Sequence, residues 1–433
     1  MKRYLAIVLV LAMFVTCLPL GTLAESTDHV TLTVWHTWGK GAGLDAMHDI
    51  ATKFNETIGK EKGITVNIDY VASKTSGNTQ TMEKLMAAIA AGEAPDIAIL
   101  DNFQVASWAA QSALTPLDDL MNDAGFSLNG MYDWAKEGSV YQGAIYSIPY
   151  NGDVRCLFVN MDLFEKAGLT EADIPRTIEQ LTIVAKKLTI EDDMGGFEQV
   201  GFIPWANAGK PIYTWGWAFD GNFYDKEKNV LTVNAPEIIE ALQWEYDFAS
   251  EYGLSKFVDF ASGVIAGSGA TDAFVSRKIA MAVKRNDELT DINTYAPDMN
   301  LKVAPIPTKD ESITTTWAGG WGLTIPRGAK HPQASIEFMK YMASEEAQSI
   351  MASVGNSLSP IKSVSEAVFS ENPQFETILE VLPYAQVRPS VPVGQMLWDN
   401  LNTVLNNVLY EKGTPEEQLN GLYETINEEL SMY

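Results

Sequence analysis

The sequence predicts an α/β protein whose first hundred residues build a largely parallel sheet. Residues 31–35 alternate apolar and polar side chains, residues 63–71 are rich in β-branched residues, and residues 94–101 form a short apolar run typical of a strand buried on both faces. Two amphipathic helices separate these strands. A β-α-β-α-β order requires right-handed crossovers, which lay the strands side by side in parallel.

The two intervening helices are indicated by the spacing of their apolar residues. Apolar positions from Leu44 to Phe54 and from Met82 to Ile89 recur every three or four residues, so each set forms one helix face. Gly92 follows the second helix in the usual C-terminal position.

The rest of the chain continues with strands and helices. We predict strands within 143–160, 275–283, 301–307 and 317–328, and helices starting at 161 and covering 235–252 and 332–351. Residues 200–224 are rich in loops and contain Trp205, Trp215 and Trp217. If this stretch is extended, Trp215 and Trp217 share one face. The tail from residue 393 reads as two helices joined near Gly413.

The N-terminus has the features of a secretory signal peptide, residues 1–24. Lys2 and Arg3 precede an apolar stretch, and small residues stand before a cleavage point after Ala24. The alternative is a lipoprotein signal with Cys17 as the lipidated residue, although residues 14–16 match that pattern poorly. Cleavage leaves 409 residues, enough for two or three domains.

Composition and charge exclude several classes of partner. The formal net charge is −26, and loss of Lys2 and Arg3 makes it −28, which argues against nucleic acid and anionic lipid surfaces. Cys156 is the only cysteine left after cleavage, so no internal disulfide forms. Asp45, His48 and Asp49 share a helix face but have no distant partner, so we expect neither a metal nor a cofactor.

In open α/β sheets, ligands bind beyond the carboxyl ends of the strands. Trp35, His36 and Trp38 end or follow the first strand, and Asp101 and Asn102 end the third. We therefore expect these side chains at one rim, facing the same crevice. For Asp101 the competing interpretation is an N-cap of the next helix.

Several segments in order resemble the bacterial extracellular solute-binding proteins of ABC-type sugar importers, the family that includes maltose-binding protein. The segments carrying the resemblance are "TLTVWHTWGKGAGLDAMHDIATKFNE", "KLMAAIAAGEAPDIAIL", "YSIPYNGDVRCLFVNMDLFEKAGL", "FVSRKIAMAV" and "AGGWGLTIPRGAKHPQASIEFMKYMASEEAQ". Each motif is weak alone, but their shared order covers nearly the whole mature chain.

The resemblance implies a two-lobed periplasmic-binding-protein fold, in which each lobe is a sheet flanked by helices and hinge crossings border an interlobe ligand cleft. It places 25–148 with 306–355 in the N-terminal lobe and 149–305 with 356–433 in the C-terminal lobe. The crossings are expected near 147–151, 304–308 and 355–360. Such proteins hand a small molecule to a membrane permease, and we expect an exported monomer that performs no chemistry.

A sugar site combines flat aromatic rings, which pack on apolar C–H faces, with charged or amide side chains for the hydroxyls. By matching positions and spacing, the candidate ligand-binding residues are Trp35, His36, Trp38, Asp101, Asn102, Asn151, Asp153, Arg155, Trp215, Trp217, Arg285, Gly320, Trp321, Arg388 and Trp398.

Most of these candidates also have a structural interpretation. Asp153 and Arg155 have the same strand parity, so they can pair with each other as an ion pair at the hinge. Arg285 and Arg388 can serve structural ion pairs, and the tryptophans can pack in the cores. Arg285 stands where the family often has a tryptophan, which favours a more polar, even anionic, glycoside.

Three functions remain open from the sequence. The leading one is binding of an oligosaccharide or glycoside for import. A glycerol-phosphate-type binder is the second, because such relatives also begin with Trp-His and an arginine can hold a phosphate, although no glycine-rich phosphate loop is present. The third is a secreted glycoside hydrolase, which would need two carboxylates across a glycosidic bond; no pair stands in a recognisable catalytic context.

Overall fold

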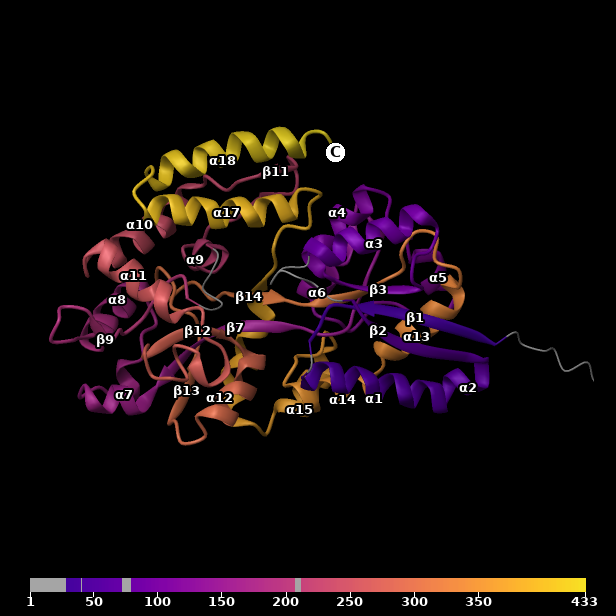
Figure 1. Cartoon of the computed structure of the whole chain (residues 1–433), viewed down its shortest axis with the longest axis horizontal. Coiled ribbons are helices and arrows are strands. Elements are labelled where there is room, and N and C mark those ends of the chain that lie inside the picture. The colour runs from indigo at the N-terminus through magenta and orange to yellow at the C-terminus, as the bar shows by residue number, and fades with distance from the viewer. Residues whose placement is uncertain (1–28, 40, 72–78, 207–211) are drawn as a thin grey trace, which may run out of the picture.

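The computed structural model describes residues 29–39, 41–71, 79–206 and 212–433. It contains two five-stranded sheets with helices around each, and the two resulting lobes lie side by side along the long axis of the molecule (Figure 1). The expected signal peptide and Cys17 lie outside the described residues. No helix in the described ranges combines the length and apolarity needed to cross a membrane.

The sheet of the first lobe has the strand order β2-β1-β3-β15-β6. β1 pairs in parallel with both β2 and β3, as predicted, whereas β15 runs antiparallel to β3 and β6. The bounds are β1 (Val30–His36), β2 (Ile64–Tyr70), β3 (Ile97–Asp101), β6 (Ile148–Pro149) and β15 (Trp321–Thr324).

Helices from two distant parts of the chain surround this sheet. Leu32 and Val34 of β1 pack with Phe54 of the first helix and Phe338 of a much later helix in one core. The helices are α1 (Ala42–Glu56), α2 (Ile58–Lys62), α3 (Thr79–Ala91), α4 (Val105–Ala110), α5 (Asp118–Asp123), α13 (Pro332–Met342) and α14 (Glu345–Gly355).

The second lobe is built on a sheet of order β12-β7-β14-β16, with β13 also paired to β7. Its central strand β7 is buried along nearly its whole length and contains the free thiol of Cys156. The bounds are β7 (Asp153–Asn160), β12 (Met281–Arg285), β13 (Leu301–Ala304), β14 (Thr316–Gly319) and β16 (Ala385–Gln386).

Ten α-helices and two short hairpins complete the second lobe within the described ranges, and α6 (Asp133–Glu137) packs against its core. The helices are α7 (Met161–Lys166), α8 (Ile178–Lys187), α9 (Tyr213–Ala218), α10 (Pro236–Ser250), α11 (Leu254–Val264), α12 (Leu289–Tyr295), α15 (Lys362–Phe369), α16 (Glu376–Val381), α17 (Gly394–Leu409) and α18 (Pro415–Leu430). The hairpins are β8 (Ile190–Glu191) with β9 (Phe197–Gln199) and β10 (Tyr224–Asp225) with β11 (Val230–Leu231). A further hairpin, β4 (Val140–Tyr141) with β5 (Ala144–Ile145), belongs to the first lobe, where β4 contacts α4 and Ile145 packs against the core.

Three chain crossings join the lobes. One lies between β6 and β7 and another between α14 and α15, close to the expected positions, and Gly152 and Leu358 of these two crossings pair with each other. The remaining crossing falls at Gly320, between β14 and β15, instead of near 304–308, because β14 still belongs to the second sheet. The exact division of the chain into domains stays a prediction.

Two local predictions were wrong. Residues 213–218 form helix α9, so Trp215 and Trp217, two residues apart, point to different sides instead of sharing a strand face. The single helix expected over 332–351 is two helices, because Ser344 caps a new helix by accepting a hydrogen bond from the Ala347 N–H.

The first crossing leaves no room for a side chain at Gly152. A Cβ there would lie 2.2 Å from the Trp134 ring, so Gly152→Ala should lower the free energy of unfolding by about 1–3 kcal/mol. Gly263 in α11 has open space around it, and Gly263→Ala should raise stability by about 0.5–1 kcal/mol. Urea unfolding of both variants measures these changes in the free energy of unfolding. Equal changes for Gly152→Ala and Gly263→Ala would contradict the packing described around Gly152.

Candidate functional site

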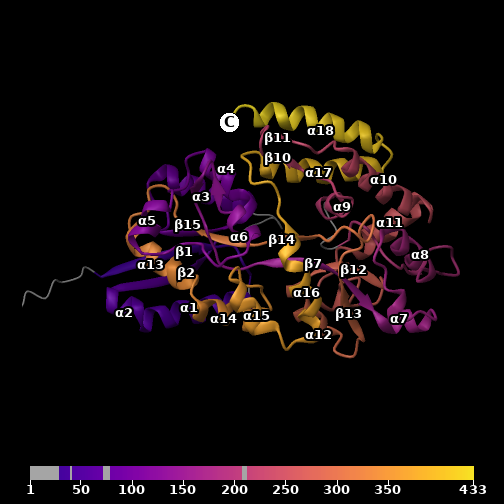
Figure 2. The same ribbon diagram turned by 180° about the vertical axis from the view of Figure 1, so that it is seen from behind.

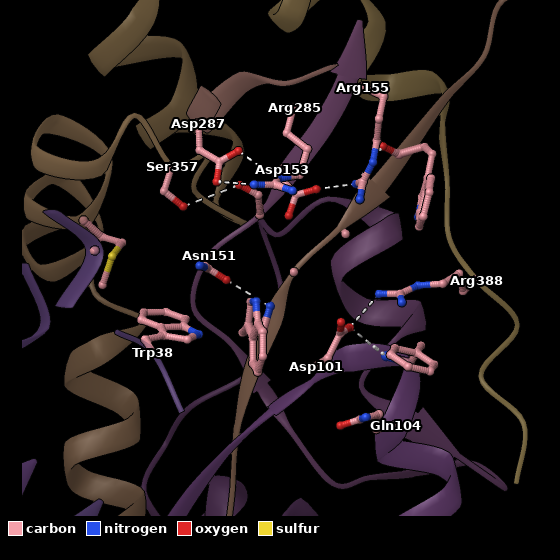
Figure 3. A pocket seen from close by; sticks show the side chains of 18 of the residues that line it. Trp38, Asp101, Gln104, Asn151, Asp153, Arg155, Arg285, Asp287, Ser357 and Arg388 are labelled. Atoms are coloured by element: carbon pink, nitrogen blue, oxygen red, sulfur yellow. Dashed lines mark hydrogen bonds and ion pairs between the residues drawn. The ribbon is translucent and has the colours of Figure 1, made fainter. Parts of the chain in front are cut away.

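A cavity of about 620 Å³ lies between the two lobes, bordered by the crossings (Figure 3). This volume is in the range of small-molecule binding sites. Both lobes contribute to its wall: Trp38, Asp101 and Trp321 come from the first, and Arg155 and Arg285 from the second.

Ten of the fifteen predicted site residues line this cavity. They come from the loop after β1, the end of β3, the crossings, β7, β12, the segment after β16, and α17. The ten are Trp38, Asp101, Asn151, Asp153, Arg155, Arg285, Gly320, Trp321, Arg388 and Trp398. Whether each of them contacts a ligand stays a prediction.

Each of the three arginines in the wall is paired with an aspartate. Arg155 forms an ion pair with Asp153, as the strand parity suggested. Arg285 holds both carboxylate oxygens of Asp287, with Nε to Oδ1 at 2.9 Å and a terminal nitrogen to Oδ2 at 3.2 Å. Arg388 donates to Oδ1 of Asp101 at 2.7 Å. The positive charges of the three arginines in the cavity wall are thus matched by the negative charges of their three aspartate partners.

Burial shifts the pKa of groups in this wall. It raises the pKa of Asp101, although Arg388 acts in the opposite direction. It lowers the pKa of Arg155 to about 10, with Asp153 opposing the shift, so the guanidinium stays charged at neutral pH.

Aromatic rings stand directly beside these charges. The guanidinium carbon of Arg155 lies 3.8 Å from the ring centre of Trp317, and that of Arg388 lies 3.8 Å from the ring centre of Phe103. On the first lobe, Trp38 meets Trp321 edge to face with 5.7 Å between ring centres. The site therefore offers flat apolar faces next to fixed hydrogen-bonding groups.

The crossings position the middle of the site. The Trp321 N–H donates to the side-chain oxygen of Asn151 at 2.9 Å, which links two crossings. A Cβ on Gly320 would lie 2.5 Å from the backbone oxygen of Asn151. Gly320 therefore serves close backbone packing, and its lack of a side chain explains its place in the cavity wall.

Two candidates of the opening Trp-His-Thr-Trp stretch, Trp35 and His36, do not line the cavity. Trp35 points to the opposite face of β1 and packs beside the small core under α3 and α4. His36 is buried, and its Nδ1 accepts a hydrogen bond from the Trp38 N–H at 3.2 Å. His36 thus supports the loop that presents Trp38.

Three further candidates lie outside the lining of this cavity. Asn102 is buried beneath the Gly320 crossing, where its N–H donates to the Gly320 carbonyl. Trp215 is fully buried and donates to the Pro204 carbonyl at 2.9 Å. Trp217 lines a different cavity, of about 710 Å³, on the other side of the chain after β16.

Other residues of the cavity wall were missed by the sequence reasoning. They are mostly neighbours of predicted residues: Phe103, Gln104, Asp287, Trp317, Ser357 and Gln395. Asp287 stands two residues after Arg285, which is a usable signal for an ion pair. Gln395 carries no such signal, because only the tertiary fold brings α17 beside the end of β3.

No group of three or more His, Cys, Asp or Glu side chains in the described part of the chain has an arrangement that could hold a metal ion. Polar contacts in the cavity wall are instead made by arginines, carboxylates and amides. The arrangement suits reversible binding of a hydroxyl-rich molecule.

Comparison with known proteins identifies the family. Residues 41–349 match the bacterial extracellular solute-binding protein family, and the chain belongs to it. The sn-glycerol-3-phosphate-binding periplasmic protein UgpB of Escherichia coli is 26% identical over 293 residues, which are 64% of this chain and 61% of that protein. The chain therefore spans about three fifths of the length of these curated relatives.

Solved structures with the same fold include sugar-binding proteins. CpMnBP1 with mannobiose bound is similar with a TM-score of 0.78 and 27% identity, covering 92% of this chain and all of that one. The ABC substrate-binding protein Lmo0181 from Listeria monocytogenes, in complex with cycloalternan, has a TM-score of 0.77 and 21% identity over 93% of this chain and all of that chain. The predicted two-lobed periplasmic-binding-protein fold is confirmed.

The support that His36 gives to Trp38 is open to test by pH. Burial and the nearby His48 lower the pKa of His36, and Asp69 opposes this shift. Below the usual pKa of 6.5, His36 is therefore protonated in the unfolded chain more readily than in the folded chain. The free energy of unfolding should therefore fall as the pH drops below 6.5.

His36→Asn removes this contribution and keeps a side-chain oxygen that can accept from Trp38. The variant should lose less unfolding free energy than the unchanged protein between about pH 7 and pH 5. Denaturant unfolding at several pH values provides the comparison. Parallel pH profiles for the two proteins would show that His36 is not held neutral by the fold.

Proposed function

We propose that this chain is the substrate-binding component of an ABC importer and binds an oligosaccharide or glycoside in the cleft between its lobes. The observation that carries the proposal is the placement of four tryptophans of the cavity wall among three arginine–aspartate pairs. The four are Trp38, Trp317, Trp321 and Trp398.

This arrangement matches the two surfaces of a sugar. Indole faces cover the apolar C–H side of the ring, while carboxylates, guanidiniums and amides meet the hydroxyls. The pairs hold their side chains in place before ligand arrives, because each aspartate is fixed by its arginine. Such preorganisation lowers the entropic cost of binding.

The relatives add support for transport. Family members serve as extracellular receptors, and CpMnBP1, the structural relative at 27% identity, was solved with mannobiose and with mannotriose. On this basis the exported chain, released after Ala24, captures sugar outside the cytoplasmic membrane and delivers it to permease subunits. We propose that it acts as a monomer and does not bind nucleic acid.

Binding of glycerol phosphate is the second candidate, since UgpB is among the relatives. The charges of the cavity argue against it. A phosphate would meet Asp101, Asp153 and Asp287 as well as the arginines, because each guanidinium in the wall already has an aspartate partner. A neutral polyhydroxyl ligand avoids this repulsion.

We also propose that the cleft performs no chemistry. Its three aspartates are engaged with arginines, whereas glycoside hydrolysis requires one carboxyl group to serve as a proton donor and another as nucleophile or base. Incubation with chromogenic glycosides tests this, and turnover by the purified chain would overturn it.

A thermal-shift screen tests the proposed ligand class. Mannobiose, mannotriose, maltose and maltotetraose, each assayed beside glycerol 3-phosphate, cover the two candidates. At least one sugar should raise the melting temperature, because ligand binding stabilises the folded state, while glycerol 3-phosphate should not. A shift with glycerol 3-phosphate alone would favour the second candidate.

Trp321→Leu should weaken binding of the sugar found in that screen by about tenfold or more, since removal of a stacked indole costs at least ~1.4 kcal/mol. Trp35→Leu is the matched control, because it removes an indole of the same lobe that lies outside the cavity. Isothermal titration compares the two. Equal losses of affinity would show that Trp321 does not contact the sugar.

A further inference from the structure

A second cavity, of about 710 Å³, lies behind the segment that follows β16. Its lining comes mainly from α6, α9, the residues around β10, the start of α10, and residues 385–389, and no described residue lines both this cavity and the cleft cavity. Figure 1 and Figure 2 show α6 near the middle of the long axis, where the two lobes meet. The volume of this second cavity is in the range of small-molecule binding sites.

The segment after β16 separates the two cavities. Arg388 lines the cleft cavity, whereas its neighbours Val387 and Pro389 line the second one, so adjacent side chains turn to opposite sides. Gln386 of β16 pairs with Trp317 of β14, which fixes the start of this segment to the second sheet. The two cavities are therefore separate volumes that share a wall of main chain.

Stacked aromatic rings form one wall of the second cavity. Trp217 lines it and stacks on Tyr213, with 5.4 Å between ring centres and 25° between ring planes. Tyr213 in turn stacks on Trp398 of the cleft cavity, with 6.4 Å between ring centres. These neighbours hold Trp217 in place, so the second cavity offers a rigid indole surface of the kind on which the apolar C–H side of a sugar packs.

Hydrogen-bond acceptors outnumber positive charges around the second cavity. Three of its five carboxylates have lysine partners. Asp220 and Glu237 form no ion pair within the described ranges, so both stay available to accept hydrogen bonds from a ligand. An anion would be repelled by this lining. The charged lining residues are Asp133, Glu137, Asp220, Asp225, Lys226 and Glu237.

One buried donor in the wall of the second cavity lacks a partner. Trp134 is only 5% exposed, and its indole N–H makes no hydrogen bond within the described part of the chain. Buried donors without a partner are uncommon in folded proteins. A hydroxyl group can accept from an indole N–H and also donate to a carboxylate, which neither an ammonium group nor a carboxylate ligand can do. The polar groups of this cavity therefore favour a hydroxyl-rich ligand.

We propose that the second cavity is a further carbohydrate site, distinct from the cleft, which takes a neutral, hydroxyl-rich molecule. The inference goes beyond the proposed function, because it adds a site that shares no described lining residue with the cleft. Trp217 packs on the C–H side of the sugar, and Asp220 and Glu237 accept from its hydroxyls. The Trp134 N–H donates to a sugar oxygen. One chain can therefore hold two sugar molecules at once.

Equilibrium dialysis of the full chain counts the sugar molecules that it binds. Glucose, maltose and mannobiose serve as neutral probes, and gluconate serves as an anionic one. At least one neutral probe should reach two molecules per chain at saturation. Trp321→Leu, which weakens the cleft site, should leave the second molecule bound. Gluconate should not bind to Trp321→Leu, because the acidic lining of the second cavity repels it.

Trp217→Leu should weaken binding of the second molecule by about tenfold or more, because the rigid indole surface is lost. Trp244→Leu is the matched control, since this half-buried tryptophan of the same lobe lines neither cavity. It should leave the binding of both molecules unchanged. Circular dichroism verifies the folding of each variant.

A surface variant keeps the test valid if Trp217→Leu fails to fold. Asp220→Asn combined with Glu237→Gln should weaken binding of the second molecule by about threefold or more, because hydrogen bonds to charged acceptors are the stronger ones. Glu240→Gln is its control, since Glu240 lies on the same helix, outside the cavity lining, and pairs with Lys309.

The outcomes separate the second site from the cleft. A single bound molecule that is lost in Trp321→Leu would overturn the second site and leave the proposed function standing. A single bound molecule that is lost only in Trp217→Leu would support the second site and contradict the proposed cleft site. Two bound molecules whose affinities change in neither Trp217→Leu nor the double variant would overturn the second site, as would the absence of any bound neutral probe.

Discussion

The cleft depends on the pairing of arginines with aspartates at the boundary between two lobes. The side chains of Arg155 and Arg388 are only 8% and 9% exposed, and charges this deeply buried need the close partners that Asp153 and Asp101 provide. Arg285, which is 39% exposed, pairs with Asp287. The pairs fix side chains that would otherwise move freely, and they keep the cavity wall balanced in charge. Tryptophan rings pack beside these ion pairs, which helps to hold the rings in place. The proposed recognition of a neutral, hydroxyl-rich molecule rests on this combination.

The pairs connect binding with closure. Asp153 and Arg155 lie within one strand of the second lobe, and Arg285 and Asp287 lie two residues apart, so both of these pairs survive any movement of the lobes. The pair of Asp101 with Arg388 differs, because its members belong to different lobes. The two pairs within the second lobe thus hold part of the site in place at all times, while the pair of Asp101 with Arg388 depends on the cleft being closed.

The fold was largely predictable from the sequence, and the site only in part. The spacing of apolar residues predicted β1, β2, β3 and α1, because this pattern depends only on residues close together in the sequence. The direction of individual side chains could not be predicted from local sequence. Trp215 lies in the core because residues 213–218 are helical, and Trp35 faces away from the cavity because neighbouring strand residues point to opposite faces of the sheet. Trp317 and Gln395 reach the cavity through packing of segments far apart in the chain, which no spacing rule shows.

The central claim is that indole faces between two lobes hold a sugar that the protein leaves unchanged. A crystal structure of the chain with the sugar that gives the largest thermal shift tests it most directly. The account predicts an intact sugar between the lobes, stacked on Trp38, Trp321 or Trp398 and hydrogen-bonded to the paired aspartates and arginines. A sugar bound outside the cavity, or found cleaved within it, would contradict the account.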